Sequence, residues 1–187
     1  MFRKLLQRIR SDDRPYGLYG AIVAQARQPA FYQGIGIADT AEGRFDMIVL
    51  HVVLVMRRLR GEGAEGRSRA QALIDLFFDD MDRNLREMGV SDMAVPKRIR
   101  SMVEAFYGRA GVYDAALDAA GAEGLEAALE RNLFAGPAAQ ASLDAMAAYV
   151  VASAEALMKT SGDALAAGRI DWPAIPTSAV EDRERAE

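Results

Sequence analysis

The 187-residue chain contains no cysteine and a single histidine, His51. The lack of cysteine excludes disulfides, a cysteine nucleophile and cysteine-ligated zinc or iron–sulfur sites, and it agrees with a reducing compartment. One histidine leaves few ways to build a metal site or a catalytic triad. The Gly-Lys-Ser/Thr end of a phosphate-binding loop is also missing. Most standard chemistry-bearing motifs are therefore absent from the sequence.

Long hydrophobic runs are scarce too. The longest, Met47–Met56, has about half of the roughly 20 residues that a membrane span requires. It predicts a buried core helix. The first ten residues alternate basic and apolar side chains and lack the continuous apolar core of a secretion signal. We therefore expect a cytoplasmic protein.

What the chain does contain is helical periodicity, with no segment that alternates like a strand. At 51% hydrophobic and 27% charged it has the composition of an ordinary globular domain. The predicted fold is all-α, a single-domain bundle of about 7–8 helices. The expected helices are 16–28, from a cap at Asp39 to about Arg60, 67–88 with Gly89 as C-cap, from Pro96 to Gly108, 112–120, 123–133 and 137–160.

The predicted organisation has three parts. Residues 1–14 form a basic amphipathic arm, residues 15–172 the helical domain and residues 173–187 a polar tail that frays from about Trp172 onward. Within the domain, residues 29–38 are expected to be an irregular loop whose Phe31–Tyr32 pair packs inward or meets a partner. Gly61–Gly66 is expected to be a flexible turn.

Charge is distributed unevenly. Residues 1–109 hold 18 basic and 14 acidic side chains, a balance of +4, whereas residues 110–187 hold 5 and 13, a balance of −8. The first ten residues alone carry +4 beside a small apolar face. This arm is predicted to contact an anionic membrane or another anion, with ribosomal RNA as an alternative and folding onto the domain as a third. Its basic residues are Arg3, Lys4, Arg8 and Arg10.

His51 lies in the middle of the apolar run, which favours a neutral core histidine with one internal partner. Two functional roles of His51 remain as alternatives. It could be the general base of a triad, although it would then need access to substrate. It could also be a haem or metal ligand, with methionine as its only soft companion.

The densest carboxylate group in the chain is Asp75, Asp79, Asp80 and Asp82. Three of them, Asp75, Asp79 and Asp82, share one face of a predicted helix. Metal ligation is one interpretation. The other is a solvated or partner-facing rim, because Asp79 precedes Arg83 by four residues and Asp82 precedes Arg86 by four, the orientation that favours ion pairs. After a short link, three basic residues lie at the N-terminus of the next predicted helix, where the helix dipole is already positive. They indicate an acidic partner. The alternative is that they pair with Glu87 or with the aspartates. The three basic residues are Lys97, Arg98 and Arg100.

Several strings resemble the ubiquinol–cytochrome c chaperone family, over about residues 16–160 and in the right order. The first are Leu18-Tyr-Gly-Ala-Ile-Val-Ala-Gln-Ala-Arg27 with Phe31-Tyr32, and Asp39-Thr-Ala-Glu-Gly-Arg-Phe-Asp-Met-Ile-Val-Leu-His51. The others are Asp79-Asp-Met-Asp-Arg-Asn-Leu-Arg-Glu-Met-Gly89, Val95-Pro-Lys-Arg-Ile99, Ala105-Phe-Tyr-Gly-Arg109 and Tyr113-Asp-Ala-Ala-Leu117. The short arm looks like that of an alphaproteobacterial member.

The resemblance implies a non-enzymatic assembly factor for respiratory complex III. Such a factor holds newly made cytochrome b near the ribosome and needs neither cofactor, metal nor DNA. It would be cytoplasmic and peripheral at the inner membrane. An apolar-ligand carrier for lipid, quinone or haem and an aspartate-based metal enzyme are the alternatives. The positions that match the family's polar motifs, and are predicted to bind the partner, are Arg44, Asp46, Asp79, Asp82, Arg83, Lys97 and Arg98.

Overall fold

The computed structural model describes residues 14–119, 122–134 and 136–176, and in these residues the fold is all-helical, without strands. Six helices of 12–25 residues build it: α2 (Arg14–Ala26), α4 (Ala41–Leu59), α5 (Gly63–Glu87), α6 (Val95–Asp118), α7 (Ala122–Leu133) and α8 (Gln140–Lys159). Two five-residue helices, α3 (Pro29–Gln33) and α9 (Gly162–Ala166), and a 3₁₀ turn (Arg60–Glu62) complete the described part. The prediction of seven to eight helices therefore overestimates the number of long helices, which is six in the described residues.

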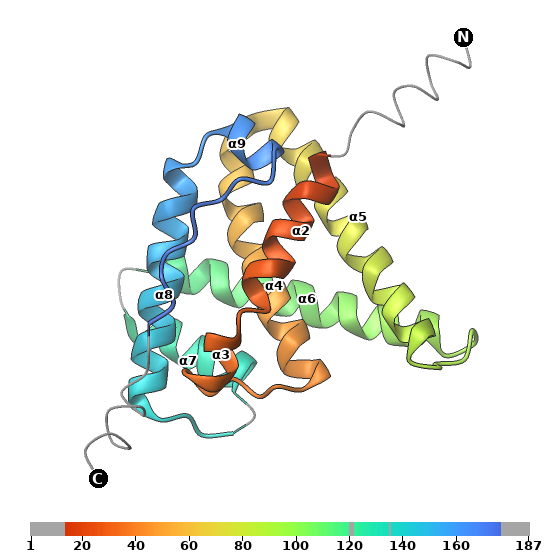
Figure 1. Cartoon of the computed structure of the whole chain (residues 1–187), viewed down its shortest axis with the longest axis horizontal. Helices are drawn as coiled ribbons and strands as arrows, with labels where there is room; N and C mark the ends of the chain where they lie inside the picture. Colours follow the sequence, from red (N-terminus) through yellow and green to blue (C-terminus); the bar gives the residue numbers. More distant parts are fainter. Residues whose placement is uncertain (1–13, 120–121, 135, 177–187) are drawn as a thin grey trace.

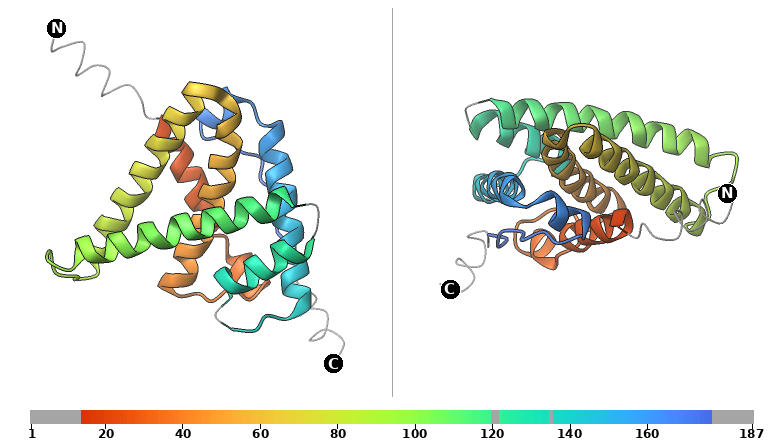
Figure 2. Two further views of the ribbon diagram at one scale, coloured as in Figure 1. Left: turned by 180° about the vertical axis from the view of Figure 1, so that it is seen from behind. Right: turned by 90° about the horizontal axis from the view of Figure 1, so that it is seen from above.

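Helix α4 is the centre of the molecule. Its apolar run is buried on every side, as expected for a helix that is hydrophobic all round. It packs against α2, α5, α6, α7 and α8. The views in Figures 1 and 2 show three layers: α6 and α7 on one side, α4, α5 and α8 in the middle, and α2, α3 and α9 on the other.

The joint between α4 and α5 is tighter than the predicted flexible turn. The chain passes from α4 through the 3₁₀ turn directly into α5 at Gly63, which has φ +64°. Gly66 is buried one turn later, and a Cβ there would collide with the carbonyl oxygen of Leu59. Gly63 thus provides the positive φ of the turn and Gly66 the close approach of α5 to the end of α4. Helix α5 begins about four residues earlier than predicted.

Helix α6 runs unbroken through Gly108, where the prediction placed a break. Glycine costs a helix about 1 kcal/mol relative to alanine, but one stripe of side chains continues through this point into the core. Phe106, Ala110 and Tyr113 of this stripe are all buried. Tertiary packing therefore overrides the local preference. At the other end Pro96 lies in the first turn, as predicted.

The caps are close to those predicted. Gly89 ends α5 with φ +80°, and the amide of Val90 donates to the carbonyl of Leu85, the bond pattern of a Schellman motif. The N-cap of α4 is Thr40 rather than Asp39: its hydroxyl accepts from the Gly43 amide at 3.1 Å. Asp39 instead pairs with Arg44, with Oδ1 and Nε 2.6 Å apart.

The segment after α9 is packed, contrary to the prediction that the chain frays from Trp172. It runs back along α2 and α8 (Figure 1), and the Trp172 ring meets the His51 ring edge-on at 5.1 Å. Ile170 and Ile175 also pack against the core. Three apolar side chains in a polar stretch are enough to hold it there. The basic arm and residues 177–187 lie outside the described residues.

Candidate functional site

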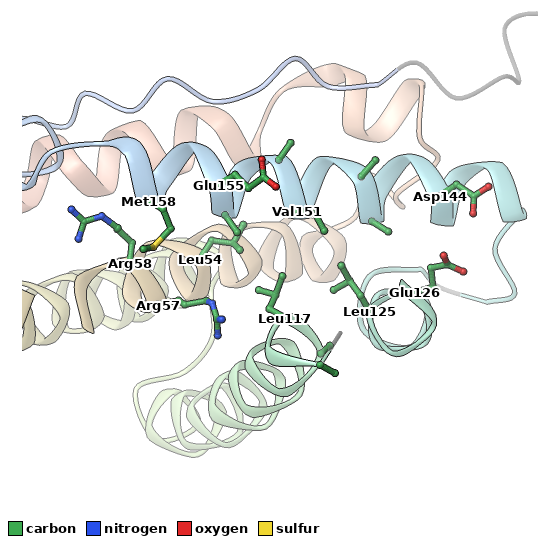
Figure 3. A pocket seen from close by; sticks show the side chains of 16 residues that line it. Leu54, Arg57, Arg58, Leu117, Leu125, Glu126, Asp144, Val151, Glu155 and Met158 are labelled. Carbon is green, nitrogen blue, oxygen red and sulfur yellow. The ribbon is translucent and has the colours of Figure 1, made fainter. Parts of the chain in front are cut away.

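An open groove of about 1080 Å³ is lined by α8, α6 and α7, with the C-terminal half of α4 at its base (Figure 3). Leu54 forms part of the base, Leu117 and Leu125 face it from α6 and α7, and Val151 projects from α8. Most of the lining is apolar, and much of it is alanine. Small side chains leave room for the backbone of a second helix to come close.

The α8 wall of this groove is a regular stripe of exposed side chains. Asp144, Ala148, Val151, Glu155 and Met158 follow one another at intervals of 4, 3, 4 and 3 residues, and all five are exposed. Val151 keeps 44% of its surface in solvent and Met158 keeps 70%. This spacing is the seam that a partner helix occupies in a coiled coil, and it is unoccupied in the described chain.

Helix α8 therefore has two apolar faces. By length and composition it is the one helix in the described residues that could cross a bilayer, but core helices pass the same test, and 44% of its apolar window is buried. Its inner face carries Met146, Tyr149, Val150 and Leu157, each at most 1% exposed. Val151 and Met158, on the stripe that lines the groove, stay exposed, so packing within this fold does not cover all the apolar side chains of the helix.

The two ends of the groove differ in charge. Figure 3 shows Asp144 and Glu126 at one end and Arg57 and Arg58 at the other. The first two both accept a hydrogen bond from Gln140 Nε2, at 2.8 and 2.9 Å. Among the residues that the structure describes, neither has a cation within ion-pair distance.

The arginine end is already neutralised. Arg57 pairs with Asp118 and with Asp114, and its hydrogen bond lowers the pKa of the Asp118 carboxyl, so that pair stays ionised. Arg58 donates to the carbonyl oxygens of Leu157 at 3.0 Å and Thr160 at 2.9 Å, which caps the C-terminus of α8. The uncompensated charge of the groove is therefore negative.

His51 lies on the opposite side of α8 and is sealed. It is fully buried; its Nδ1 is 2.8 Å from the Met47 carbonyl and its Nε2 is 2.8 Å from the Tyr149 hydroxyl. Because a carbonyl can only accept, Nδ1 carries the proton, Nε2 accepts from Tyr149, and the Tyr149 oxygen accepts from Gln25 at 2.9 Å. Burial lowers the histidine pKa to about 4. The prediction of a neutral core histidine is confirmed, with two partners instead of one.

Asp46, one of the predicted partner-binding residues, lies in an ion pair with Arg109, at 2.9 Å between Oδ1 and Nη2. The Asp46 side chain is only 13% exposed. Burial raises the pKa of Asp46 to about 6, although Arg109 opposes the shift. The Arg109 guanidinium also lies 6.0 Å from the centre of the Phe45 ring. The arrangement ties α4 to α6, so Asp46 has a structural contact of its own.

The other predicted partner-binding residues come from three helices. Asp79, Asp82 and Arg83 lie on α5, Lys97 and Arg98 at the start of α6, and Arg44 at the start of α4. Helices α5 and α6 diverge from their link and project from the body (Figure 2). Asp82 pairs with Arg86 as predicted, at 2.6 Å, and Arg100 pairs with Glu104 at 3.2 Å.

The remaining members of this group are exposed. Asp79, Arg83, Lys97 and Arg98 have no ion pair within the described ranges of the chain. Asp80, next to Asp79, instead accepts a hydrogen bond from the Tyr19 hydroxyl at 2.8 Å, which joins α2 to α5. No group of three potential metal ligands occurs in the described residues. The basic arm, with Arg3, Lys4, Arg8 and Arg10, lies outside them.

Sequence reasoning missed the groove. The signal was present in the 4-3-4-3 spacing of residues 144–158, but two of its five positions are acidic and a third is alanine, so it does not stand out as an apolar stripe. Only the packing shows which of the two apolar faces of α8 is buried.

Comparison with known proteins identifies relatives of this fold. The family model described as "Ubiquinol-cytochrome C chaperone" matches residues 33–172. The crystal structure of the Cbp3 homolog from Brucella abortus superposes with a TM-score of 0.81 and 38% sequence identity, covering 94% of this chain and 98% of that one.

Curated relatives are more distant. Ubiquinol-cytochrome-c reductase complex assembly factor 1 of Xenopus laevis is 27% identical over 116 residues, which are 62% of this chain and 58% of that protein. The mouse protein of the same name is 26% identical over 157 residues, which are 83% of this chain and 53% of that protein. The chain thus spans about half the length of the curated relatives that it matches.

Proposed function

Because the chain belongs to the ubiquinol–cytochrome c chaperone family, we propose that it is a non-enzymatic assembly factor of respiratory complex III that binds newly made cytochrome b. The observation that carries the proposal is the family match over residues 33–172, which includes every helix from α4 to α9. The relatives from frog and mouse are named as assembly factors of the ubiquinol–cytochrome c reductase complex.

The placement of the polar groups supports binding over catalysis. His51, the side chain best suited to proton transfer at neutral pH, is closed off from solvent, and its burial keeps it uncharged. Asp46 and Arg109 neutralise each other between two helices. In contrast, α8 exposes Ala148, Val151 and Met158 beside the groove, on the same stripe as two acidic residues.

An apolar-ligand carrier is the second candidate function, and the volume of the groove favours it. Small-molecule sites, however, enclose most of their ligand. Here five lining residues of the α8 wall are exposed to solvent, from Asp144 to Met158. The groove therefore fits a macromolecular segment better than a lipid, quinone or haem.

We place the protein on the cytoplasmic side of the inner membrane, where cytochrome b enters the bilayer. Binding to the ribosome follows if cytochrome b is engaged during its synthesis. In sucrose gradients, cosedimentation with ribosomes that translate cytochrome b, lost on puromycin release, would support the ribosomal contact. Sedimentation only at the top of the gradient in both conditions would contradict it.

Native mass spectrometry of the protein purified from its own host tests the main proposal. Copurified cytochrome b, together with loss of assembled complex III in a deletion strain, is the expected result. A stoichiometric apolar molecule without cytochrome b would favour the carrier, and a stoichiometric divalent metal would favour the aspartate enzyme. Normal complex III in the deletion strain would overturn the assembly role.

A further inference from the structure

We propose that the groove between α8, α6 and α7 binds an apolar helix that carries basic residues at one end, the form of a transmembrane segment where it leaves the bilayer. The proposal rests on the proposed function, because it names the part of a membrane-protein client that the chaperone would hold. It also makes a claim about this chain alone, that its surface selects a helix of that composition.

The spacing of the exposed side chains on α8 favours a helix as the segment that binds in the groove. Its exposed side chains recur at 4-3-4-3 spacing from Asp144 to Met158, and such a stripe meets a partner helix along its whole length, whereas an extended strand would follow a two-residue repeat. Fourteen residue steps of α-helix span about 21 Å. An occupant of about four turns therefore matches the groove, and that is less than a complete membrane span.

The lining selects an apolar surface at close range. Ala148 and Ala152 project little from the α8 backbone, while Leu54, Leu117 and Leu125 supply the base and the opposite wall. Helices in a membrane approach one another by the same means, with small residues on one surface and larger apolar ones on the other. Val151 and Met158, the most protruding apolar side chains of the stripe, become buried when the occupant is present.

The negative charges of the groove favour basic residues on the bound helix and fix the direction in which that helix lies. Asp144 and Glu126 at one end, and Glu155 on the exposed stripe, have no cation partner in the part of the chain that the structure describes. The arginine end is occupied by its own acids and by the α8 carbonyls. A pair of Lys or Arg residues just before the first turn of the bound helix would lie beside these acids. The positive N-terminal end of the dipole of the bound helix would then lie there too. Membrane segments carry such residues on the cytoplasmic side.

Two labelled peptides test this without cytochrome b. One has Lys-Lys before about 14 Leu and Ala residues, and its twin has Glu-Glu in place of the lysines. Fluorescence polarisation with the full chain is expected to show binding of the Lys peptide at least about ten-fold tighter than that of the Glu peptide. Val151→Lys should weaken binding of the Lys peptide about ten-fold. Met93→Lys is the matched control because Met93, 94% exposed, lies outside the groove.

A second pair of variants tests the acidic end. Asp144→Lys with Glu126→Lys should remove the preference for the Lys peptide, and Glu87→Lys, an exposed acid outside the groove, should leave it unchanged. Far-UV circular dichroism and melting verify that the variants are folded. Equal binding to the groove variants and their controls, or no binding of either peptide to the native chain, would overturn the inference.

Cytochrome b capture then connects the groove to the proposed function. A photocrosslinker at position 151 is expected to label newly made cytochrome b, and one at position 171, exposed and outside the groove, is not. If the native chain captures no cytochrome b but binds the Lys peptide, the proposed client is wrong and the groove specificity stands. If cytochrome b is captured equally by Val151→Lys, it binds elsewhere. Crosslinking from position 151 to a second copy would show self-association instead and overturn the proposal.

Discussion

Both faces of helix α8 carry apolar side chains, but only one of them is buried in the core. The inner face places Met146, Tyr149 and Val150 in a sealed core where even the tyrosine hydroxyl is hydrogen-bonded. The outer face presents Ala148, Val151 and Met158 to solvent beside three carboxylates. Hydrophobicity alone therefore does not tell which surface stabilises the fold and which remains for a partner. Packing against the other helices does so, because it buries the inner face and leaves the outer one in solvent.

Adjacent valines offer the sharpest contrast. Val150→Asp buries a carboxylate among the core residues and should lower the free energy of unfolding by about 4 kcal/mol or more. Val151→Asp, one position on, should change it by less than about 0.5 kcal/mol, because Val151 is 44% exposed whereas Val150 is fully buried. Urea denaturation measures both. Equal losses would show that the outer face is part of the core.

Replacement of His51 by alanine tests the sealed side. It removes a buried ring and leaves the Tyr149 hydroxyl without its acceptor, so we expect a loss of about 3 kcal/mol and a fall in melting temperature of roughly 6–12 °C. Tyr149→Phe, which keeps the ring and removes only the hydroxyl, should lose less. Capture of cytochrome b per folded molecule should be unchanged in both. A folded His51→Ala protein that captures none would contradict a purely structural role.

Acid should destabilise the sealed side through the same histidine. Its pKa is lowered from 6.5 to about 4 in the folded protein, so between these values the unfolded chain binds more protons and stability falls as pH falls. The loss reaches about 3 kcal/mol near pH 4. Asp46 opposes it: its pKa is raised from 3.8 to about 6, so the folded protein binds the extra proton and its contribution falls as pH rises through this range.

The two contributions separate in single variants. Asp46→Asn removes the opposing group, so its stability should fall more steeply than that of the native chain between pH 6 and pH 4. His51→Ala leaves only the opposing group and should show a flatter or reversed dependence over the same interval. Urea denaturation at half-unit pH steps measures both slopes. Parallel curves for all three proteins would show that these buried groups do not titrate as their surroundings indicate.

How far the sequence predicted this contrast depends on the helix. In α4 the uninterrupted apolar run was sufficient to predict a core helix and a buried His51. In α5 the sequence spacing of 4, 3, 4 and 3 residues predicts one apolar seam, formed by Ile74, Phe78, Met81, Leu85 and Met88. The prediction is only partly correct, because Leu73 and Phe77 are fully buried whereas Met88 is 68% exposed. Periodicity gives the number of apolar faces, but the direction of each face depends on neighbours that are distant in sequence.

The site was less predictable than the fold for the same reason. Asp82 pairs with Arg86 as its four-residue spacing predicts, since both groups lie on one helix. The Asp46–Arg109 pair joins helices α4 and α6, 63 positions apart in the chain (109 − 46), and no local pattern announces it. The groove exists only when α4, α6, α7 and α8 are packed together, because each of them contributes lining residues. Contacts within a helix can be predicted from spacing, whereas surfaces shared by several helices cannot.

Charge reversal on α5 tests whether the molecule has a second binding surface. Asp79→Lys with Asp82→Lys should change the melting temperature little, because both residues lie on the outer side of α5 and the one ion pair lost is exposed. If the predicted partner-binding residues contact the client, its capture should fall about ten-fold. Glu104→Lys with Asp171→Lys, two exposed acids elsewhere, is the matched control. Unchanged capture would leave the groove as the binding surface and remove the α5–α6 residues from it.

The smallest effect is expected from the basic arm, whose Arg3, Lys4, Arg8 and Arg10 carry +4 without an acid. Each basic residue near an anionic leaflet contributes about 1 kcal/mol, so the arm alone supports attachment that is weak and salt-sensitive. Such attachment would keep the groove near the bilayer without preventing release of the client. In cosedimentation at low salt, the full chain should pellet with anionic vesicles more than a chain that lacks residues 1–12, and neither should pellet with neutral vesicles. Equal pelleting of the two chains on anionic vesicles would exclude the arm as the membrane contact.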